Sequence, residues 1–576
     1  MTSQKHRGEL QRTAFAAGAV LAVVAVAGAA PGAGAAPKAT PGTPQLKLIA
    51  ASKSVTLDRW EWDGQAGVNL DLGTYVSVDN APLEFKVTRK SYKDPVVAQQ
   101  ILRDGKKVKT KTLPAGLVRD FQGLSGFLEV SIKNAAGAQV LTAKGDFCPN
   151  NASGRIRPDA PATSHYPQSC PANPFTLGSV WGVEKGWAAN TSTGDRDKPT
   201  DLAVGEYTAK VSVAKKYRDY FGMADAPQTV KLTVRESPEG GEGGVGLRSS
   251  GAHGSHGAKA AHGAHGAHAG HGAQQGAEPA PGGGHHYGSR GADEPTAPAF
   301  PHALEARGLA RHLGDGKGHT DGSRIAPALK ANAQRPTGRA TVPANVPKPD
   351  LRSLPAWGFE ITDGEDGDVP GKDYLAFSAN VWNAGPAPLV VDGFRSPGKD
   401  LMDAYQYFYD ASGKQVGYTP TGTMEWDPRI GHEHWHFTDF ASYRLLSADK
   451  TKQVRSGKEA FCLANTDAVD YTVKNANWHP HNTDLSTACG EQNSISVREV
   501  LDVGSGDTYT QYRPGQSFDI TGLPNGTYYV EVLANPAKRL KETDLTNNTS
   551  LRKVVLGGTT GARTVSVPPY DLVNAP

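Results

Sequence analysis

Three histidines stand at alternate positions in residues 431–437, which read GHEHWHF. Successive side chains of an extended chain point to opposite faces, so His432, His434 and His436 share one face and Trp435 takes the other. Imidazole ligands suit copper, zinc, nickel and iron, and affinity alone ranks copper(II) highest. The spacing therefore predicts a metal site. Three edge-strand histidines that are merely exposed or hydrogen-bonded are the alternative.

The geometry of a flat strand limits such a site. At about 3.3 Å per residue, positions 432 and 436 lie about 13 Å apart, whereas a metal–nitrogen bond is only about 2 Å long. Gly431 permits backbone conformations that other residues avoid, and an added residue bends a strand. We therefore expect the chain to bend or bulge at the triad.

Length and charge restrict the class of protein. The chain has 576 residues, enough for two or three domains with real cores. Its formal net charge is +3, and its Lys and Arg residues are scattered along the chain. Nucleic-acid binders present a clustered basic surface, so we exclude nucleic acid as a partner.

The N-terminus has the pattern of a secretory signal peptide. Basic residues precede an apolar stretch over residues 14–30 and a small-residue segment that ends at Ala36. The apolar core is short and rich in Ala and Gly, and a membrane-spanning helix needs about 20 apolar residues. The sequence predicts a signal peptide over residues 1–36, a secreted mature chain and no transmembrane anchor after cleavage.

Two regions alternate short strand patterns with turn residues, from about residue 46 to 234 and from 347 to 556. They predict an all-β fold with two antiparallel β-sandwich domains joined by a long disordered linker. The expected limits are residues 40–236 for the first domain, 237–345 for the linker, 346–560 for the second domain and 561–576 for a C-terminal tail. No motif assigns a role to the first domain.

The predicted linker is rich in Gly, Ala, His and Pro and has almost no large apolar residues. Such a segment buries too little surface to offset its chain entropy, so we expect it to be disordered. Its histidines either have no role or gather metal loosely. Eight of them lie in the Gly- and Ala-rich tract: His253, His256, His262, His265, His268, His271, His285 and His286.

Four cysteines occur as two pairs by position. An exported chain permits disulfides, so we predict Cys148 with Cys170 and Cys462 with Cys489, each pair closing a short loop within its own domain. Free thiols are the alternative.

Five segments in a fixed order carry a resemblance to a known family. The triad segment GHEHWHFTDFASYRLL is followed by SGKEAFCL, GDTYTQYRPGQSFDI, GLPNGTYYVEVLANP and ETDLTNN. Over about residues 349–556 they resemble the catalytic domain of the lysyl oxidases, which are copper-dependent amine oxidases. The resemblance does not extend to the first β domain or to the linker.

The resemblance implies copper held by His432, His434 and His436, and a lysine tyrosylquinone cofactor made from Lys458 and Tyr509. In the family, copper and dioxygen oxidise the tyrosine to a quinone, to which the lysine amine adds. A quinone is an electron sink that unmodified side chains lack. The implied activity converts a primary amine or peptidyl lysine, with dioxygen, to an aldehyde, hydrogen peroxide and ammonia. Taken alone, such a lysine is usually a solvated charge and such a tyrosine a packing residue.

The resemblance does not carry over a catalytic base, because the chain departs from the animal enzymes there. Extra residues, including Trp478 to His481, lie between the cofactor residues, and Ser442 stands where animal members carry a histidine. Proton abstraction needs a group within hydrogen-bond reach, so Asp507, two residues before Tyr509, is a candidate. His479 and His481 are alternatives.

Two further alternatives stay open. Tyr512 is the nearest rival to Tyr509, although an ungapped count back from Ile520 and Thr521 favours Tyr509. The alternative function comes from a different class of protein. It is a non-catalytic secreted copper- or zinc-binding surface or adhesion protein, in which the triad holds metal without turnover. The histidine-rich linker, which an oxidase does not obviously need, motivates this reading.

Overall fold

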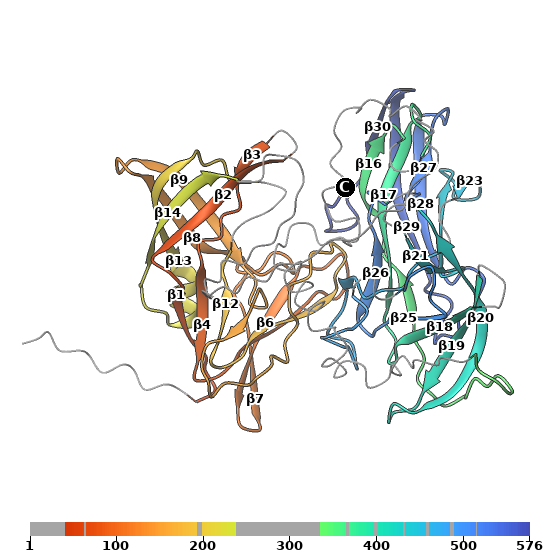
Figure 1. The fold of residues 1–576 in the computed structure, drawn as a ribbon, viewed down its shortest axis with the longest axis horizontal. Helices are drawn as coiled ribbons and strands as arrows, with labels where there is room; N and C mark the ends of the chain where they lie inside the picture. Colours follow the sequence, from red (N-terminus) through yellow and green to blue (C-terminus); the bar gives the residue numbers. More distant parts are fainter. Residues whose placement is uncertain are drawn as a thin grey trace, which may run out of the picture. The chain divides into compact units, whose positions relative to one another are not determined.

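The structure is a computed structural model that describes residues 41–62, 65–192, 199–237, 335–364, 368–395, 401–429, 433–456, 460–483, 489–513 and 515–576. These residues form strands β1 to β30 and a single short helix, α1 (Lys215–Phe221) (Figure 1). The predicted all-β class is therefore confirmed. The predicted signal peptide lies outside the described residues, and so does nearly all of the predicted linker.

The strands of the first β region form three sheets. The first sheet has the order β1 (Gln45–Ala50), β4 (Thr74–Asp79), β12 (Trp187–Asn190) and β10 (Gly154–Arg155). The second has the order β11 (Gly178–Val183), β5 (Leu83–Thr88), β6 (Val97–Asp104) and β7 (Lys107–Thr112). The third has the order β3 (Gln65–Val68), β2 (Ser54–Trp62), β14 (Gln228–Glu236), β13 (Gly205–Val213), β8 (Leu124–Asn134) and β9 (Gln139–Phe147).

Alternating burial explains why these segments become strands. In β14, Val230, Leu232 and Val234 are buried, whereas Lys231 and Arg235 are exposed. This period of two is expected for a strand with one face on a core and one in water. Pairing is antiparallel as predicted, except that β14 runs parallel to β2.

The strands of the second β region also form three sheets. One has the order β15 (Leu351–Ser353), β17 (Tyr374–Asn383), β26 (Ser505–Tyr509) and β24 (Asp467–Ala468), with β16 (Trp357–Thr362) and β27 (Ser517–Asp519) also paired to β17. Another has the order β21 (His434–Phe437), β20 (Gln415–Asp427), β19 (Leu401–Tyr409), β18 (Leu389–Arg395) and β25 (Ser496–Leu501). The last has the order β23 (Gln453–Ser456), β22 (Ala441–Leu446), β28 (Gly526–Ala534), β29 (Thr549–Thr559) and β30 (Ala562–Ser566).

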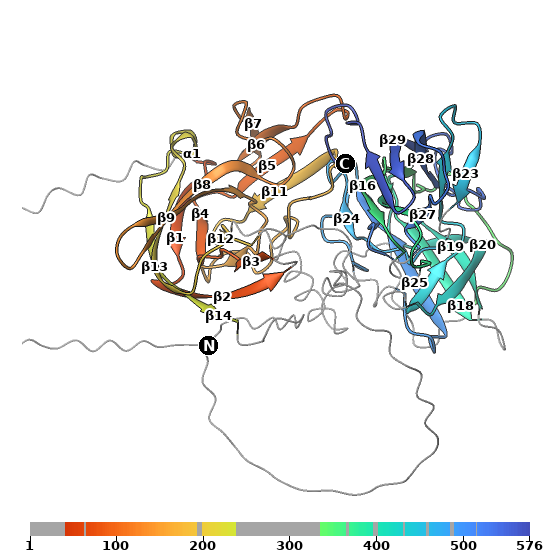
Figure 2. The ribbon, with the colours of Figure 1, turned by 90° about the horizontal axis from the view of Figure 1, so that it is seen from above.

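One hydrophobic core contains residues of both the triad strand and the strand that carries Tyr509. Strands β18, β19 and β20 lie side by side in two views at right angles (Figures 1 and 2). The core of this region includes Trp435 and Phe437 from β21, Tyr443 from β22, Phe461 from a loop and Tyr509 from β26. Segments about 70 residues apart in sequence, the triad strand and the Tyr509 strand, therefore pack into the same core.

Three other sequence predictions concern the covalent and domain organisation. Both predicted disulfides are present, Cys148–Cys170 and Cys462–Cys489. The described residues from 41 to 576 cluster as one unit, and the predicted domain limits stay a prediction. In the part of the chain that is described, no helix is long and apolar enough to span a membrane.

Candidate metal and cofactor site

Two of the three triad histidines lie on β21. His434 and His436 are buried, at 3% and 2% exposure, and their ring centroids are 4.8 Å apart. They share a face, as alternation along a strand predicts. The pairing of β21 with β20, from His434 opposite Asp427 to Phe437 opposite Met424, has no register shift. The expected bulge is thus not found within β21, and His432 lies outside the described residues.

The opposite face of β21 packs against the protein. The Trp435 side chain is fully buried, its Nε1 donates to the Glu491 carbonyl at 3.0 Å, and its ring meets the Trp426 ring edge-on. The Trp435 amide donates to the Cys489 carbonyl at 3.1 Å. These contacts fix the strand on the face opposite the histidines.

A carboxylate lies beside one nitrogen of the second described histidine. His436 Nδ1 is 3.4 Å from Asp427 Oδ2, and Asp427 also accepts hydrogen bonds from the Arg429 guanidinium. In metal sites, a carboxylate at one ring nitrogen orients the imidazole and sets which nitrogen carries the lone pair. The arrangement fits a ring whose Nε2 faces a metal.

The described residues do not by themselves complete a metal site. Among them, no three His, Cys, Asp or Glu side chains are grouped closely enough to hold an ion. Two neighbouring imidazoles, one oriented by a carboxylate, nevertheless fit part of the predicted three-imidazole donor set.

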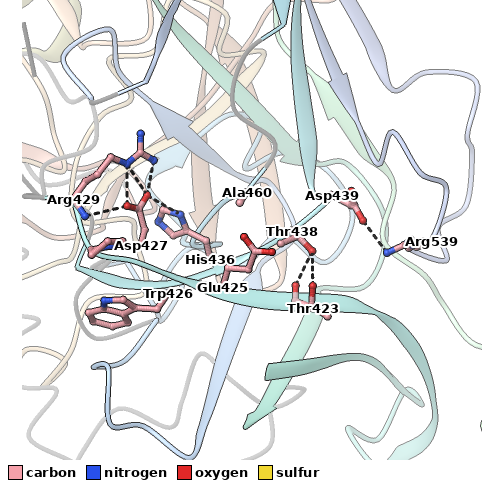
Figure 3. A pocket seen from close by; sticks show the side chains of 11 residues that line it. Thr423, Glu425, Trp426, Asp427, Arg429, His436, Thr438, Asp439, Ala460 and Arg539 are labelled. Carbon is pink, nitrogen blue, oxygen red and sulfur yellow. Dashed lines mark hydrogen bonds and ion pairs between the residues drawn. The ribbon is translucent and has the colours of Figure 1, made fainter. Parts of the chain in front are cut away.

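A cavity of about 530 Å³ opens beside His436 (Figure 3). Its charged walls hold two ion pairs, Asp427 with Arg429 and Asp439 with Arg539, and the Glu425 carboxylate. Its lining is Thr423, Glu425, Trp426, Asp427, Pro428, Arg429, His436, Thr438, Asp439, Ala460 and Arg539. Of the two described triad histidines, His436 lines this cavity and His434 does not.

Tyr509 is tied to the chain segment that pairs with the triad strand. Its phenol oxygen accepts a hydrogen bond from the Cys462 amide at 2.9 Å, and its ring meets the Phe461 ring edge-on at 4.9 Å. Phe461 in turn exchanges two backbone hydrogen bonds with Phe437, at 2.7 and 2.9 Å.

Tyr512 lies in the turn after β26 and is half-buried. Lys458 lies outside the described residues, two positions before Ala460 of the cavity wall.

Asp507 shares a strand face with Tyr509 and is 2% exposed. Burial, and to a smaller extent the Asp507 charge, raises the pKa of the Tyr509 phenol well above its usual value, whereas the hydrogen bond from the Cys462 amide lowers this pKa. The phenol is therefore neutral in the protein without a bound ligand. Its ionisation needs a cation or a base beside it.

Glu499 is a buried acid that sequence reasoning did not single out. It is fully buried, its Oε2 accepts a hydrogen bond from the Leu463 amide at 2.9 Å, and its Oε1 has no hydrogen-bond partner among the described residues. Burial, with a smaller contribution from Asp507, raises the pKa of Glu499 well above its usual value. The available signal was its position between Val497 and Leu501, which places an acid on the inner face of a strand.

Glu499→Gln is expected to flatten the dependence of stability on pH. Native Glu499 keeps its proton above about pH 4.3, where an unfolded glutamate ionises, so wild-type stability falls as the pH rises from that value. Glutamine keeps the acceptor for Leu463 and has no proton to lose. In urea unfolding at successive pH values, the advantage of the variant should grow by up to about 1.4 kcal/mol per pH unit. Parallel curves for both proteins would contradict the assignment.

One of the two alternative bases, His481, lies near a third acid, Asp502. His481 Nδ1 is 3.6 Å from Asp502 Oδ2. Burial raises the pKa of Asp502 to about 7 and lowers the pKa of His481 to about 4, so His481 is uncharged at neutral pH. The contact is therefore not an ion pair there. The identity of the catalytic base stays a prediction.

The Cys462–Cys489 disulfide connects the two halves of the site. Cys462 donates its amide to the Tyr509 phenol, and Cys489 accepts from the amide of Trp435 in the triad strand. The bond closes a loop with a sequence separation of 27. It therefore couples the position of the phenol to that of the histidine strand.

Removing this disulfide with Cys462→Ala and Cys489→Ala is expected to lower the free energy of unfolding by about 3.5 kcal/mol, from the entropy of the loop released. The matched control removes Cys148–Cys170, whose separation of 22 predicts a similar loss. Chemical unfolding measures both losses. Only the first variant should also increase hydrogen exchange at the backbone amide of position 462, and equal exchange in both variants would disprove the coupling.

Comparisons with known proteins agree with this region. Residues 410–564 match the family model described as Lysyl oxidase. Lysyl oxidase homolog 3B of Danio rerio is 34% identical over 131 residues, which is 22% of this chain and 14% of that protein. Protein-lysine 6-oxidase of Homo sapiens is 33% identical over 125 residues, 21% of this chain and 26% of that protein. Lysyl oxidase homolog 2 of Xenopus tropicalis is 31% identical over 139 residues, which is 23% of this chain and 16% of that protein.

The matched region, residues 410–564, belongs to the lysyl oxidase family, which confirms the resemblance found in the sequence. The chain spans only about a seventh to a quarter of the length of these relatives. Among solved structures, a tetra-tandem repeat in the extending region of a large adhesion protein aligns at 7% identity over 88% of this chain and 99% of that one. Its TM-score of 0.09 establishes no common fold.

Proposed function

We propose that this chain is a secreted copper-dependent amine oxidase. It would convert primary amines, including peptidyl lysine, with dioxygen to aldehydes, hydrogen peroxide and ammonia. The observation that carries the proposal is the tie between the Tyr509 phenol and the histidine strand, through Cys462 and Phe461, inside the family-matched region.

His432, His434 and His436 would hold the copper in this proposal. Bound copper supplies the redox chemistry with dioxygen that converts a tyrosine to a quinone. Support comes from the shared face and close rings of His434 and His436 and from the carboxylate of Asp427 at His436. Among the common divalent metals, copper(II) binds such imidazole nitrogens most tightly.

Lys458 would supply the amine that joins Tyr509. It precedes Phe461 by three residues, and three residues of extended chain span at most about 11 Å. Because the Phe461 ring contacts the Tyr509 ring, chain connectivity supports this pairing. The product, lysine tyrosylquinone, would be the electron sink of the reaction.

Asp507 would act as the base that removes the substrate proton. It is buried on the same strand face as Tyr509, where a proton acceptor is needed. The cavity beside His436 would admit the amine, with Glu425 as the wall carboxylate that is not part of the two ion pairs. Because a carboxylate attracts an ammonium group, this wall favours a cationic substrate.

A peroxide assay tests the proposed activity. Copper-loaded protein given an alkyl diamine or a lysine peptide in air should release peroxide and ammonia in equal amounts, and the chelated protein should release neither. Copper binding without peroxide from either amine would instead favour the non-catalytic metal-binding protein. No observation on the described residues favours that alternative.

A further inference from the structure

Residues of the first β region pack directly against the sheet that holds Tyr509. A hydrophobic cluster combines Phe175 of the first region with Trp382 and Val469 of the second. The Leu177 amide donates to the Val469 carbonyl at 2.8 Å, and the Tyr471 amide donates to the Gly178 carbonyl at 3.0 Å. The contact therefore combines apolar burial with backbone hydrogen bonds.

One carboxylate oxygen of Asp467 joins this contact to the Tyr509 strand. Asp467 Oδ2 accepts from Asn173 Nδ2 and from Thr508 Oγ1, both at 2.9 Å. Thr508 Oγ1 also accepts from Asn380 Nδ2 at 2.7 Å, and its amide donates to Thr466 Oγ1 at 2.7 Å. Asn173 and Thr508 are 4% and 3% exposed, so little water competes for these bonds.

These bonds reach the face of β26 that is opposite Asp507 and Tyr509. Side chains alternate along a strand, so Thr508 points away from the face that carries Asp507 and Tyr509. Across the sheet, Asn380 lies opposite Thr508 on β17, and Asp467 lies opposite Gly506 on β24. Thr508 is therefore held from both sides, and one of the two holding residues is itself bound by the first β region.

We propose that the first β region, through Asn173 and Asp467, positions the strand that carries Asp507 and Tyr509. Asn173 and Asp467 are positioning residues in this account, and the region serves the second β region rather than a separate ligand. The effect on cofactor formation rests on the proposed function, whereas the effect on β26 itself does not.

The central variant is Asn173→Asp, which keeps the oxygen that accepts from the Phe175 amide. It replaces the donor with a negative charge facing Asp467, so the bond is lost and like charges repel. The matched control is Thr176→Val, since Thr176 Oγ1 donates to the Ala468 carbonyl at 3.1 Å in the same contact but not to the Thr508 network.

Two measurements on the full-length protein test the proposal. Hydrogen exchange of the peptide containing residues 505–509 should speed up about tenfold in Asn173→Asp and less than about twofold in Thr176→Val, on the scale of one charge-assisted hydrogen bond. After copper is added to the copper-free protein in air, quinone absorbance should appear about tenfold more slowly in Asn173→Asp only.

Substitution of Asp467 separates positioning from simple packing. Both bonds reach the same oxygen, so Asp467→Asn keeps an acceptor for them and should resemble the wild type, whereas Asp467→Ala should behave as Asn173→Asp. Equal exchange in Asn173→Asp and Thr176→Val would overturn the proposal. If exchange changes as expected but the wild type forms no quinone, the proposed function fails and the positioning role stands.

Discussion

Tyr509→Phe is expected to reduce amine oxidation to the level of the copper-free protein. The substitution keeps the ring and its contact with Phe461 but removes the phenol oxygen from which a quinone is made. The Cys462 amide loses its acceptor, which costs about 1 to 3 kcal/mol of stability. Peroxide release from an amine and visible quinone absorbance both measure the loss.

Tyr512→Phe is the matched control for this substitution, because Tyr512 is the rival tyrosine and lies outside β26. It should keep quinone absorbance and turnover. The reverse pattern, with activity retained in Tyr509→Phe and lost in Tyr512→Phe, would move the cofactor to Tyr512. Turnover in both variants would remove tyrosine-derived chemistry from the account.

His434→Ala and His436→Ala are expected to abolish tight copper binding. At a free copper concentration of about 100 times its dissociation constant, binding stabilises a folded protein by about 2.7 kcal/mol. The wild type should therefore unfold at a higher temperature with copper than without it, and the variants should not. Ligand imidazoles must be deprotonated, so the wild-type effect should fade as the pH is lowered.

His165→Ala is a suitable control for copper binding, because His165 pairs with Glu184 in the first β region and is more than half exposed. Its copper content and copper-dependent stabilisation should equal those of the wild type. Copper bound in full by His434→Ala would refute the site. In that case the linker histidines, outside the described residues, would become the site to test.

Local patterns explain which features of the fold could be predicted from the sequence. Alternating burial follows directly from residue order, as Val230, Lys231 and Leu232 illustrate, and it was enough to assign the all-β class. The same alternation placed His434 and His436 on one face. Short separations between cysteines were enough to pair them.

Contacts between distant segments explain what the sequence did not reveal. The parallel pairing of β2 with β14 joins residues 177 positions apart, such as Ser54 and Lys231, and no local pattern encodes it. Burial of Glu499 depends on what covers the inner face of β25, and the bond from Asn173 to Asp467 spans 294 positions. The expected bulge was argued from a flat strand, yet the pairing of β21 with β20 is regular over residues 434–437.

The most direct test of the account is peptide mapping by mass spectrometry of protein exposed to copper and air. The proposed cofactor predicts a single species that joins the peptide containing Lys458 to the peptide containing Tyr509, with one oxygen gained and hydrogens lost in oxidation. The species should be absent from protein kept with a chelator. Recovery of both peptides unmodified, from protein that had bound copper fully, would contradict the central claim.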